Sequence, residues 1–332
     1  MLRIAVIGAG RIGKIHAANV ARHPRARLVA IVDPIAEAGR ALAQQHGCAW
    51  KTQADALIAG DEIDAVVIAS PSDTHIELID QAAAAGKAIL CEKPIGIHIG
   101  EVQRCLEHLA KHPVPMLLGF NRRFDPSAAA LKRAAAEGAV GAIRQVIISS
   151  RDPAPPPLPA LAATGGLFRD MTIHDFDMGR WLLGEEPVEL WATASCLVDP
   201  QIASVYHDVD TAMIVMRTAS GRQCHINNCR QASYGYDQRL EVFGSEGMIA
   251  NDNLRPTTLR RFGAKGTEIR DPLLYFFLER YAQSYVLELD AFIESVLAQQ
   301  PMPVTGEDGR RALLLANAAL ESAQTGKPVR VR

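Results

Sequence analysis

The chain has 332 residues, of which 48% are hydrophobic and 22% charged, so it is long enough to fold into two globular domains with separate cores. Its net charge of −2 and pI of about 6.6 show no basic excess, which argues against nucleic acid or an anionic membrane as a partner. The six cysteines form no compact framework, no apolar run could cross a bilayer and no signal peptide is recognised, so we expect free thiols in a cytoplasmic protein.

A short apolar run at residues 3–7 ends in the sequence GAGRIG, and a helical pattern follows over residues 14–22. Strand, glycine turn and helix in this order indicate dinucleotide binding, because the glycines let the backbone turn tightly and approach a pyrophosphate at the helix N-terminus. The alternative is a glycine turn that serves packing alone. We expect the cofactor to contact Gly8, Gly10, Arg11, Ile12 and Gly13.

A second expected strand, at residues 27–32, ends in Asp33. This acid follows the last glycine of the turn by the spacing that is typical of dinucleotide-binding domains. A carboxylate in this place accepts hydrogen bonds from the adenosine ribose hydroxyls and repels a 2′-phosphate. The sequence therefore predicts NAD rather than NADP.

Strands and helices go on alternating to about residue 120. We expect helices at 36–45 and 100–110, a helix that begins with a capping box at 52–55, and strands at 65–69, 88–91 and 116–119. This alternation favours a buried parallel sheet. The predicted fold class is α/β, with a doubly wound parallel sheet that binds NAD at 1–120 and a domain for substrate binding and oligomerisation at 121–332.

Two loops follow expected strands at the edge where open α/β sheets hold their ligands. The first contains Ser70 and His75, which we expect near the cofactor, although His75 could equally be a helix residue without a ligand contact. The second contains Glu92, Lys93 and Pro94. Lys93 could direct its ammonium group to the nicotinamide or to a substrate hydroxyl, or it could be a solvated surface lysine.

The second domain begins with Asp125 and Pro126, a strong start for a helix. A strand at 143–149 leads into Arg151-Asp152 and a proline-rich loop at 153–159. From 188 to 249, apolar strands separated by turn residues show no helical period, which predicts an antiparallel sheet with one helix-covered face and one free face. Long helices are expected at 275–297 and 305–325, and the free sheet face is a candidate subunit interface.

The segment at 165–181 contains Asp170 and His174, four residues apart. On a helix the two side chains would leave one face about one turn apart, so that the carboxylate could orient the imidazole. Such a pair can take a proton from a bound alcohol. A surface ion pair or a core histidine with a satisfied hydrogen bond is the alternative.

Seven motifs in one order, GAGRIG, Asp33, CEKP, GFNRRFD, RDPAPPP, GGLFRDMTIHDFD and YGYDQR, carry a resemblance that covers essentially the whole chain. Together they resemble the glucose-fructose oxidoreductase and inositol dehydrogenase superfamily (Gfo/Idh/MocA), most closely its myo-inositol 2-dehydrogenase members. The resemblance implies a Rossmann domain, a C-terminal α/β domain with an open, mainly antiparallel sheet, and a homotetramer built through that sheet. A cis peptide bond often precedes the residue that matches Pro94.

The resemblance also implies roles for particular residues. Lys93 would contact the nicotinamide and the substrate, while Asp170 and His174 would bind the substrate, with His174 as the proton acceptor. Four further positions match residues near a polyol: Arg122, Asp152, Tyr234 and Tyr236. Asp152 departs from the pattern, because inositol enzymes can carry asparagine there, and this leaves the stereochemical preference open.

The predicted function is NAD-dependent oxidation of a cyclic polyol, foremost of myo-inositol to 2-keto-myo-inositol. The alternative substrates are scyllo-inositol, another inositol isomer or an aldose such as glucose. A metal-dependent dehydrogenase with Asp170, His174 and Asp177 as ligands is a weaker alternative, because a carboxylate-rich set without cysteine suits zinc poorly, and no metal is expected. A sensor that binds NAD and a sugar without turnover is a third reading.

Overall fold

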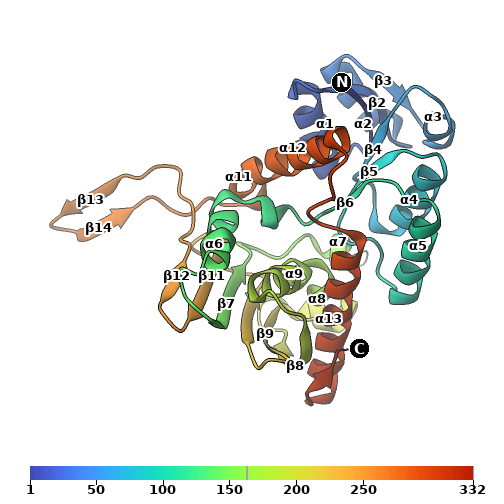
Figure 1. Ribbon diagram of the computed structural model, residues 1–332. Coiled ribbons are helices and arrows are strands. Elements are labelled where there is room, and N and C mark those ends of the chain that lie inside the picture. Colours follow the sequence, from blue (N-terminus) through green and yellow to red (C-terminus); the bar gives the residue numbers. More distant parts are fainter. Residues whose placement is uncertain (162–163, 332) are drawn as a thin grey trace. The chain divides into compact units, whose positions relative to one another are not determined.

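The computed structural model describes residues 1–161 and 164–331 (Figure 1). The chain divides into two compact units. The first comprises residues 1–124 and 284–313, and the second comprises residues 125–283 and 314–332. The chain therefore contributes to the first unit twice, once at its start and once after most of the second unit.

The first unit is built on a parallel sheet of six strands in the order β3-β2-β1-β4-β5-β6. This is the strand order of the dinucleotide-binding fold, so the predicted doubly wound parallel sheet is confirmed. The strands are β1 (Leu2–Ile7), β2 (Ala26–Val32), β3 (Ala49–Lys51), β4 (Ala65–Ile68), β5 (Ala88–Glu92) and β6 (Met116–Gly119).

Helices connect these strands, and alternate strand residues form the core with them. Val6, Val67 and Leu90 belong to one buried cluster together with Val20 of the first helix and Phe292 of a helix that comes much later in the chain. The helical elements of this part are α1 (Arg11–Arg22), α2 (Ala36–His46), α3 (Asp55–Ala59), η1 (Ser72–Thr74), α4 (His75–Ala84), α5 (Ile99–Lys111), η2 (Asn121–Phe124) and α12 (Ala282–Ala298), and α13 (Gly306–Thr325) begins in it.

The second unit contains a sheet of seven strands in the order β12-β11-β7-β10-β9-β8-β15. Its pairs are antiparallel except β7 with β10, which are parallel, so the prediction of an open, mainly antiparallel sheet is confirmed. The strands are β7 (Ile143–Arg151), β8 (Pro187–Ser195), β9 (Thr211–Thr218), β10 (Gln223–Cys229), β11 (Asp237–Gly244), β12 (Met248–Ala250) and β15 (Val329–Arg330). A separate hairpin, β13 (Arg260–Gly263) with β14 (Gly266–Arg270), projects from this unit (Figure 1).

The second unit also contains helices. They are α6 (Pro126–Ala136), α7 (Leu158–Leu161), α8 (Leu167–Asp170), α9 (Thr172–Leu183), α10 (Pro200–Tyr206) and α11 (Phe277–Arg280), and α13 ends in this unit. On strands β8 and β9 buried residues alternate with exposed apolar ones, among them Trp191, Met213 and Val215. This alternation agrees with the expected free face.

Three local predictions are wrong. Helix α10 interrupts the stretch in which no helix was expected, because Asp199 acts as an N-cap rather than as a turn residue. The predicted capping box at 52–55 is absent, since α3 begins after Ala54, which makes no side-chain cap bond. The helix expected at 275–297 is broken at Tyr281 into α11 and α12. In the part of the chain that the structure describes, no helix has both the length and the apolar character needed to span a membrane.

Asp125 confirms its predicted role as the N-cap of α6 and carries a second contact that the sequence pattern did not indicate. One carboxylate oxygen accepts a hydrogen bond from the Ala128 backbone N–H at 3.0 Å. The other accepts from the Arg280 guanidinium at 2.5 Å, in a pair whose side chains are only 4% and 2% exposed. Asp125 thus joins α6 to α11 through a buried ion pair.

We predict that Asp125→Ala lowers the free energy of unfolding by about 3–5 kcal/mol, because it leaves the Arg280 charge buried without its carboxylate. Urea unfolding followed by circular dichroism measures the change. Asp199→Ala is the matched control, since Asp199 also precedes a proline and caps a helix but forms no buried ion pair. Its expected cost is about 1 kcal/mol, and equal losses in the two variants would mean that the ion pair contributes nothing beyond the cap.

Candidate functional site

In the glycine turn after β1, backbone atoms pack closely around Gly8 and Gly13, whereas the space around Gly10 is open. A Cβ at Gly8, whose φ is +105°, would lie 2.5 Å from the Ala69 carbonyl oxygen, and a Cβ at Gly13 would overlap the Gly8 carbonyl. No atom lies within 4 Å of a Cβ placed at Gly10, which is exposed beside the N-terminus of α1. These are the roles that pyrophosphate binding requires of the three glycines: a tight turn, an open approach and close packing. Arg11 and Ile12 form the first turn of the helix that follows.

Asp33 lies at the end of β2 and is tied to the glycine turn. Its two carboxylate oxygens accept hydrogen bonds from the backbone N–H groups of Ala9, at 2.6 Å, and Ile35, at 2.8 Å. Each oxygen keeps a further lone pair that can accept from a ribose hydroxyl. Asp33 therefore has a structural task besides the predicted one, and the bond to Ala9 was not expected from sequence.

His75 joins the two loops at the carboxyl edge of the sheet. Its ring is buried, with Nδ1 2.7 Å from the Pro94 carbonyl oxygen and Nε2 2.9 Å from the Ser70 carbonyl oxygen. The Ser70 hydroxyl in turn lies 2.6 Å from the Thr74 hydroxyl. The polar atoms of His75 therefore shape the loops, and direct contacts of Ser70 and His75 with NAD stay predictions.

In the second of these loops the Lys93-Pro94 peptide bond is cis, as the resemblance implied. Glu92, at the end of β5, points its carboxylate into the first unit, where Oε1 lies 2.7 Å from His16 Nε2. Lys93 is half-buried. The two adjacent residues thus lie in different surroundings, and a contact of Glu92 with the cofactor stays a prediction.

Asp170 and His174 lie on two short helices rather than on one. Asp170 is the last residue of α8, Met171 joins the helices in helical conformation, and His174 lies in the first turn of α9. Between 171 and 180, His174 is the one residue that is not buried, and Asp170 is also partly exposed. The two side chains that were predicted to carry the chemistry therefore reach the surface of a segment that is otherwise in the core.

Sequence reasoning missed the partner of Asp170. Arg230, which follows β10, places both terminal guanidinium nitrogens 3.3 Å from Asp170 Oδ2. The Arg230 side chain is only 2% exposed, whereas that of Asp170 is 31% exposed. Arg230 thus fixes Asp170 from the protein interior and offsets its charge. An arginine just after a strand was the only signal, and it is too common to be informative.

A buried polar network holds α9 on the sheet. The Thr172 hydroxyl donates to Asn228 Oδ1 at 2.7 Å, and Asn228 Nδ2 donates to Asp175 Oδ2 at 2.7 Å. All three residues are at most 2% exposed, and Asn228 belongs to β10. Because buried polar groups are costly without partners, this network specifies one position for α9 and for His174 on it.

Tyr234 and Tyr236 lie in different surroundings. The half-exposed Tyr234 donates its hydroxyl hydrogen to Asp237 at 2.7 Å and accepts a hydrogen bond from Arg151 at 2.7 Å. Burial and the bond to Asp237 raise the pKa of Tyr234. Tyr236 is 5% exposed and packs edge-on against Tyr281, with 6.0 Å between ring centroids.

Tyr234 also lines a cleft of about 720 Å³ near the base of the β13–β14 hairpin, together with Asp237, Arg239 and Asn253. Burial alone would raise the pKa of Asp237, but hydrogen bonds from Arg239, Tyr234 and Asn253 outweigh it and lower that pKa. Asp237 is thus held ionised by its neighbours. This cleft gathers charged residues, and it contains neither Asp170 nor His174.

The remaining predicted residues are divided between the units. Arg122 lies in η2 of the first unit and is 7% exposed, and Lys93 belongs to the same unit. Asp152, whose N–H donates to the Cys229 carbonyl at 3.0 Å, belongs to the second unit with Asp170 and His174. Asp170, His174 and Asp177 do not gather as metal ligands: among the described residues, the group with suitable spacing is His16, Glu92 and Glu288.

Comparisons with known proteins agree with this geometry. The family model of the oxidoreductase family with an NAD-binding Rossmann fold (GFO_IDH_MocA) matches residues 2–120, and that of its C-terminal alpha/beta domain matches residues 132–331. The inositol 2-dehydrogenase of Rhizobium meliloti is 44% identical over 330 residues, which cover 99% of each chain.

Two solved structures are similar over the whole chain. A myo-inositol dehydrogenase from Corynebacterium glutamicum is 47% identical, with a TM-score of 0.96 over 100% of this chain and 99% of that one. A scyllo-inositol dehydrogenase from Lactobacillus casei, solved with NAD(H) and scyllo-inositol, is 30% identical, with a TM-score of 0.91 over 100% and 98%. An open glycine turn with a carboxylate at the end of β2, and full-length likeness at this level, show that the chain belongs to the Gfo/Idh/MocA family of oxidoreductases and uses NAD as its cofactor.

Proposed function

We propose that this protein oxidises myo-inositol to 2-keto-myo-inositol with NAD as the hydride acceptor. The observation that carries the proposal is the exposure of Asp170 and His174 on an otherwise buried helical segment, with Arg230 behind Asp170. A buried, well-fixed surrounding with one accessible imidazole is what a general base requires. The likeness to inositol dehydrogenases at 44% and 47% identity supports the choice of substrate.

In the proposed mechanism His174 takes the hydroxyl proton of the carbon that is oxidised. Asp170 orients the imidazole and stabilises the imidazolium that forms, and Arg230 keeps the Asp170 carboxylate in place. Lys93 donates a hydrogen bond to the developing alkoxide, which lowers the cost of its charge. NAD, when bound, accepts the hydride at C4 of the nicotinamide, so the products are the ketone, NADH and one proton.

Substrate recognition is proposed to use residues whose polar atoms suit a ligand with many hydroxyls: Arg122, Asp152, Tyr234 and Tyr236. Asp152 leaves the stereochemical preference open, and scyllo-inositol is the second candidate because the relative solved with scyllo-inositol is 30% identical with a TM-score of 0.91. The proposed cofactor contacts are those of the glycine turn, Asp33, and the loops with Ser70, His75, Glu92 and Lys93. A carboxylate at Asp33 favours NAD over NADP.

We further propose a homotetramer that forms through the free face of the seven-stranded sheet. Four large apolar side chains on β8 and β9 are 40–55% exposed: Val188, Trp191, Met213 and Val215. Trp191 pairs with Val215 across the two strands, and exposed apolar side chains gathered on one sheet face are typical of an interaction surface. We propose that a second copy of the chain binds to this face of the sheet.

A cytoplasmic location is proposed from the thiols. All six cysteines are free, and Cys91, Cys105 and Cys224 are buried. Burial raises the pKa of Cys105 to about 12, so this thiol stays protonated and inert. Free, protonated thiols are usual in a reducing compartment.

The substrate proposal predicts NADH formation at 340 nm with NAD and myo-inositol, tested beside scyllo-inositol, D-chiro-inositol and glucose. Because the base must be neutral, the rate of oxidation should rise with pH through about 6.5, the ordinary pKa of histidine. A preference for another polyol would keep the mechanism and change the substrate. Binding of NAD without turnover of any of the four would contradict the proposed activity.

Replacing the base tests its role directly. His174→Ala should lower kcat about a hundredfold or more, the usual contribution of a general base, while the melting temperature changes little because the side chain is partly exposed. His98→Ala, at an exposed histidine before α5, is the control and should leave kcat unchanged. If His174→Ala retained turnover within tenfold of the parent, another group would be the base.

The cofactor preference is tested at Asp33. Asp33→Asn removes the charge and keeps an acceptor oxygen for one of the two N–H groups, that of Ala9 or that of Ile35. The ratio of kcat/KM for NAD over NADP should fall roughly tenfold, which corresponds to about 1.4 kcal/mol of lost repulsion. Asp33→Ala should show a similar ratio with weaker binding of both cofactors. An unchanged ratio in both variants would place Asp33 away from the ribose.

A further inference from the structure

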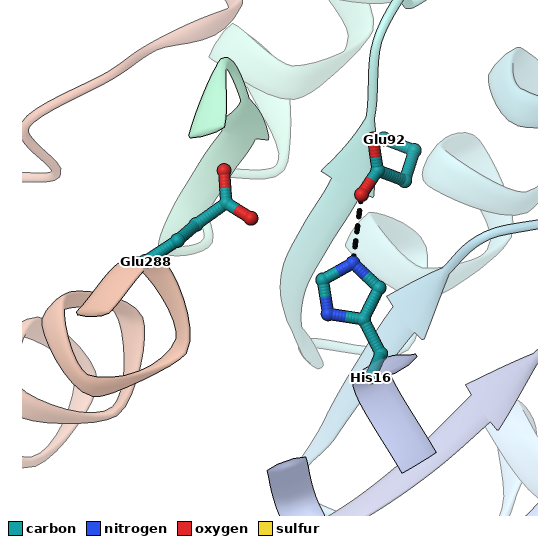
Figure 2. A group of neighbouring side chains, drawn as sticks. All are labelled: His16, Glu92 and Glu288. Atoms are coloured by element: carbon teal, nitrogen blue, oxygen red, sulfur yellow. Dashed lines mark hydrogen bonds and ion pairs between the residues drawn. The ribbon is translucent and has the colours of Figure 1, made fainter. Parts of the chain in front are cut away.

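Three ionisable side chains meet in the core of the first unit (Figure 2). His16 comes from α1, Glu92 from the end of β5 and Glu288 from α12. One ligand atom of each lies within 4.8 Å of the others, and His16 and Glu288 are 0% exposed while Glu92 is 9% exposed. Nothing in the proposed reaction uses Glu288.

The cluster is only partly hydrogen-bonded. His16 Nε2 lies 2.7 Å from Glu92 Oε1. Within the part of the chain that the structure describes, neither carboxylate oxygen of Glu288 has a hydrogen-bond partner, and His16 Nδ1 has none. Figure 2 shows the Glu288 carboxylate turned toward the other two side chains. A fully buried carboxylate without partners would be very costly if it were ionised.

Protonation of the Glu288 carboxyl group avoids the cost of burying its charge. Burial raises the pKa of Glu288 well above its ordinary value of 4.5, and the neighbouring Glu92 raises it further. The titratable groups that face Glu288 are Glu92 and His16, and the ring of Tyr285 packs edge-on against His16 with 5.7 Å between centroids. A protonated Glu288 carries no charge, and its O–H group is a donor that the ionised carboxylate lacks.

The position of Glu92 connects the cluster to Lys93. Ala88 and Leu90 of β5 belong to the core cluster that α1 and α12 cover, and Glu92 continues this face because strand side chains alternate. Lys93 is the next residue, directly after the end of β5. On β6, a Cβ at Gly119 would lie 3.1 Å from Glu92 Oε2, so the glycine makes room for the carboxylate. His16 of α1 and Gly119 of β6 thus both border the Glu92 carboxylate.

We propose that His16, Glu92 and Glu288 form a buried proton-sharing cluster, with Glu288 as the neutral acid, and that this cluster positions Lys93 for the reaction. The positioning of Lys93 rests on the proposed function, whereas the protonation state of the cluster does not. His16 and Glu288 are positioning residues, since they act on Lys93 through Glu92. A divalent cation is the competing occupant, but the direct contact of 2.7 Å between His16 and Glu92 is shorter than the separation of two donor atoms on one metal at about 2.0–2.2 Å each in tetrahedral geometry.

The state of Glu288 is tested by melting temperature against pH, without any substrate. A group whose pKa is higher in the folded state contributes stability that is lost as pH rises above its unfolded value, 4.5 for a glutamate. Glu288→Gln has no such loss, so its melting temperature should exceed that of the parent by an amount that grows by a few degrees from pH 5 to pH 8. Glu294→Gln on the same helix is the control, because Glu294 is 59% exposed, and it should show no growing gain.

Two outcomes of this measurement would overturn the neutral acid. The first is a lower melting temperature for Glu288→Gln at every pH, which would mean that an ionised Glu288 is stabilising. The second is a rise in the melting temperature of the EDTA-treated parent on addition of MnCl₂ or ZnCl₂ that is absent in Glu288→Gln. That result would assign a cation site instead.

Positioning of Lys93 is tested by kinetics of the full-length enzyme. His16→Ala removes the partner of Glu92 and should lower kcat at least about tenfold, while the Kd for NADH, measured by fluorescence, changes less than about threefold. His16→Gln keeps an N–H donor near the position of Nε2 and should restore most of kcat, and Glu288→Gln should retain it. A kcat for His16→Ala equal to that of the parent would overturn the positioning role. If the parent turned over no polyol, the proposed function would fail while the melting experiment still decided the state of Glu288.

Discussion

Loops at the carboxyl edge of a buried parallel sheet must find hydrogen-bond partners, and in this protein side chains supply them. Asp33 accepts from Ala9 and so joins the end of β2 to the glycine turn. His75 lies between the carbonyls of Ser70 and Pro94 and joins the loops after β4 and β5. These contacts join the ends of neighbouring strands, β1 with β2 and β4 with β5. They fix the loops at the edge of the sheet on which NAD binds. The residues proposed to bind the cofactor are therefore positioned by groups that also keep the fold together.

In the second unit, buried polar side chains fix the position of a helix on the sheet. Helix α9 presents His174 at its partly exposed position, and Thr172, Asn228 and Asp175 fix the helix to β10. Arg230 then holds Asp170 from behind. A helix seated by apolar contacts alone could slide or rotate at little cost, whereas a satisfied polar network accepts only one register. Asp170 and His174 thus gain a defined direction from these buried groups.

Features that depend on a short stretch of sequence could be predicted. Contacts between residues that lie far apart in the sequence could not. The glycine turn, Asp33 and the N-cap at Asp125 are local patterns, and the alternation of strands and helices gave the parallel sheet. Arg230 lies 60 residues from Asp170, and His16 lies 76 residues from Glu92, so no local pattern connects either pair. Helix α10 has only 7 residues, too few for its period to be distinguished from a turn between strands. The spacing of Asp170 and His174 predicted one helix, but Met171 separates the two residues onto α8 and α9, and their role in the site stays a prediction.

The return of the chain to the first unit over 284–313 has a consequence for synthesis and for dissection of the protein. Leu289, Phe292 and Ile293 of α12 complete the core beneath one face of the parallel sheet. While the ribosome is still making the second unit, α1 and α2 cover this face only in part, so the nucleotide-binding part cannot finish folding in the order in which it is made. A fragment cut near residue 120 would expose the same apolar surface permanently. A shortened NAD-binding unit would need α12 joined back to it, by a linker in place of residues 125–283.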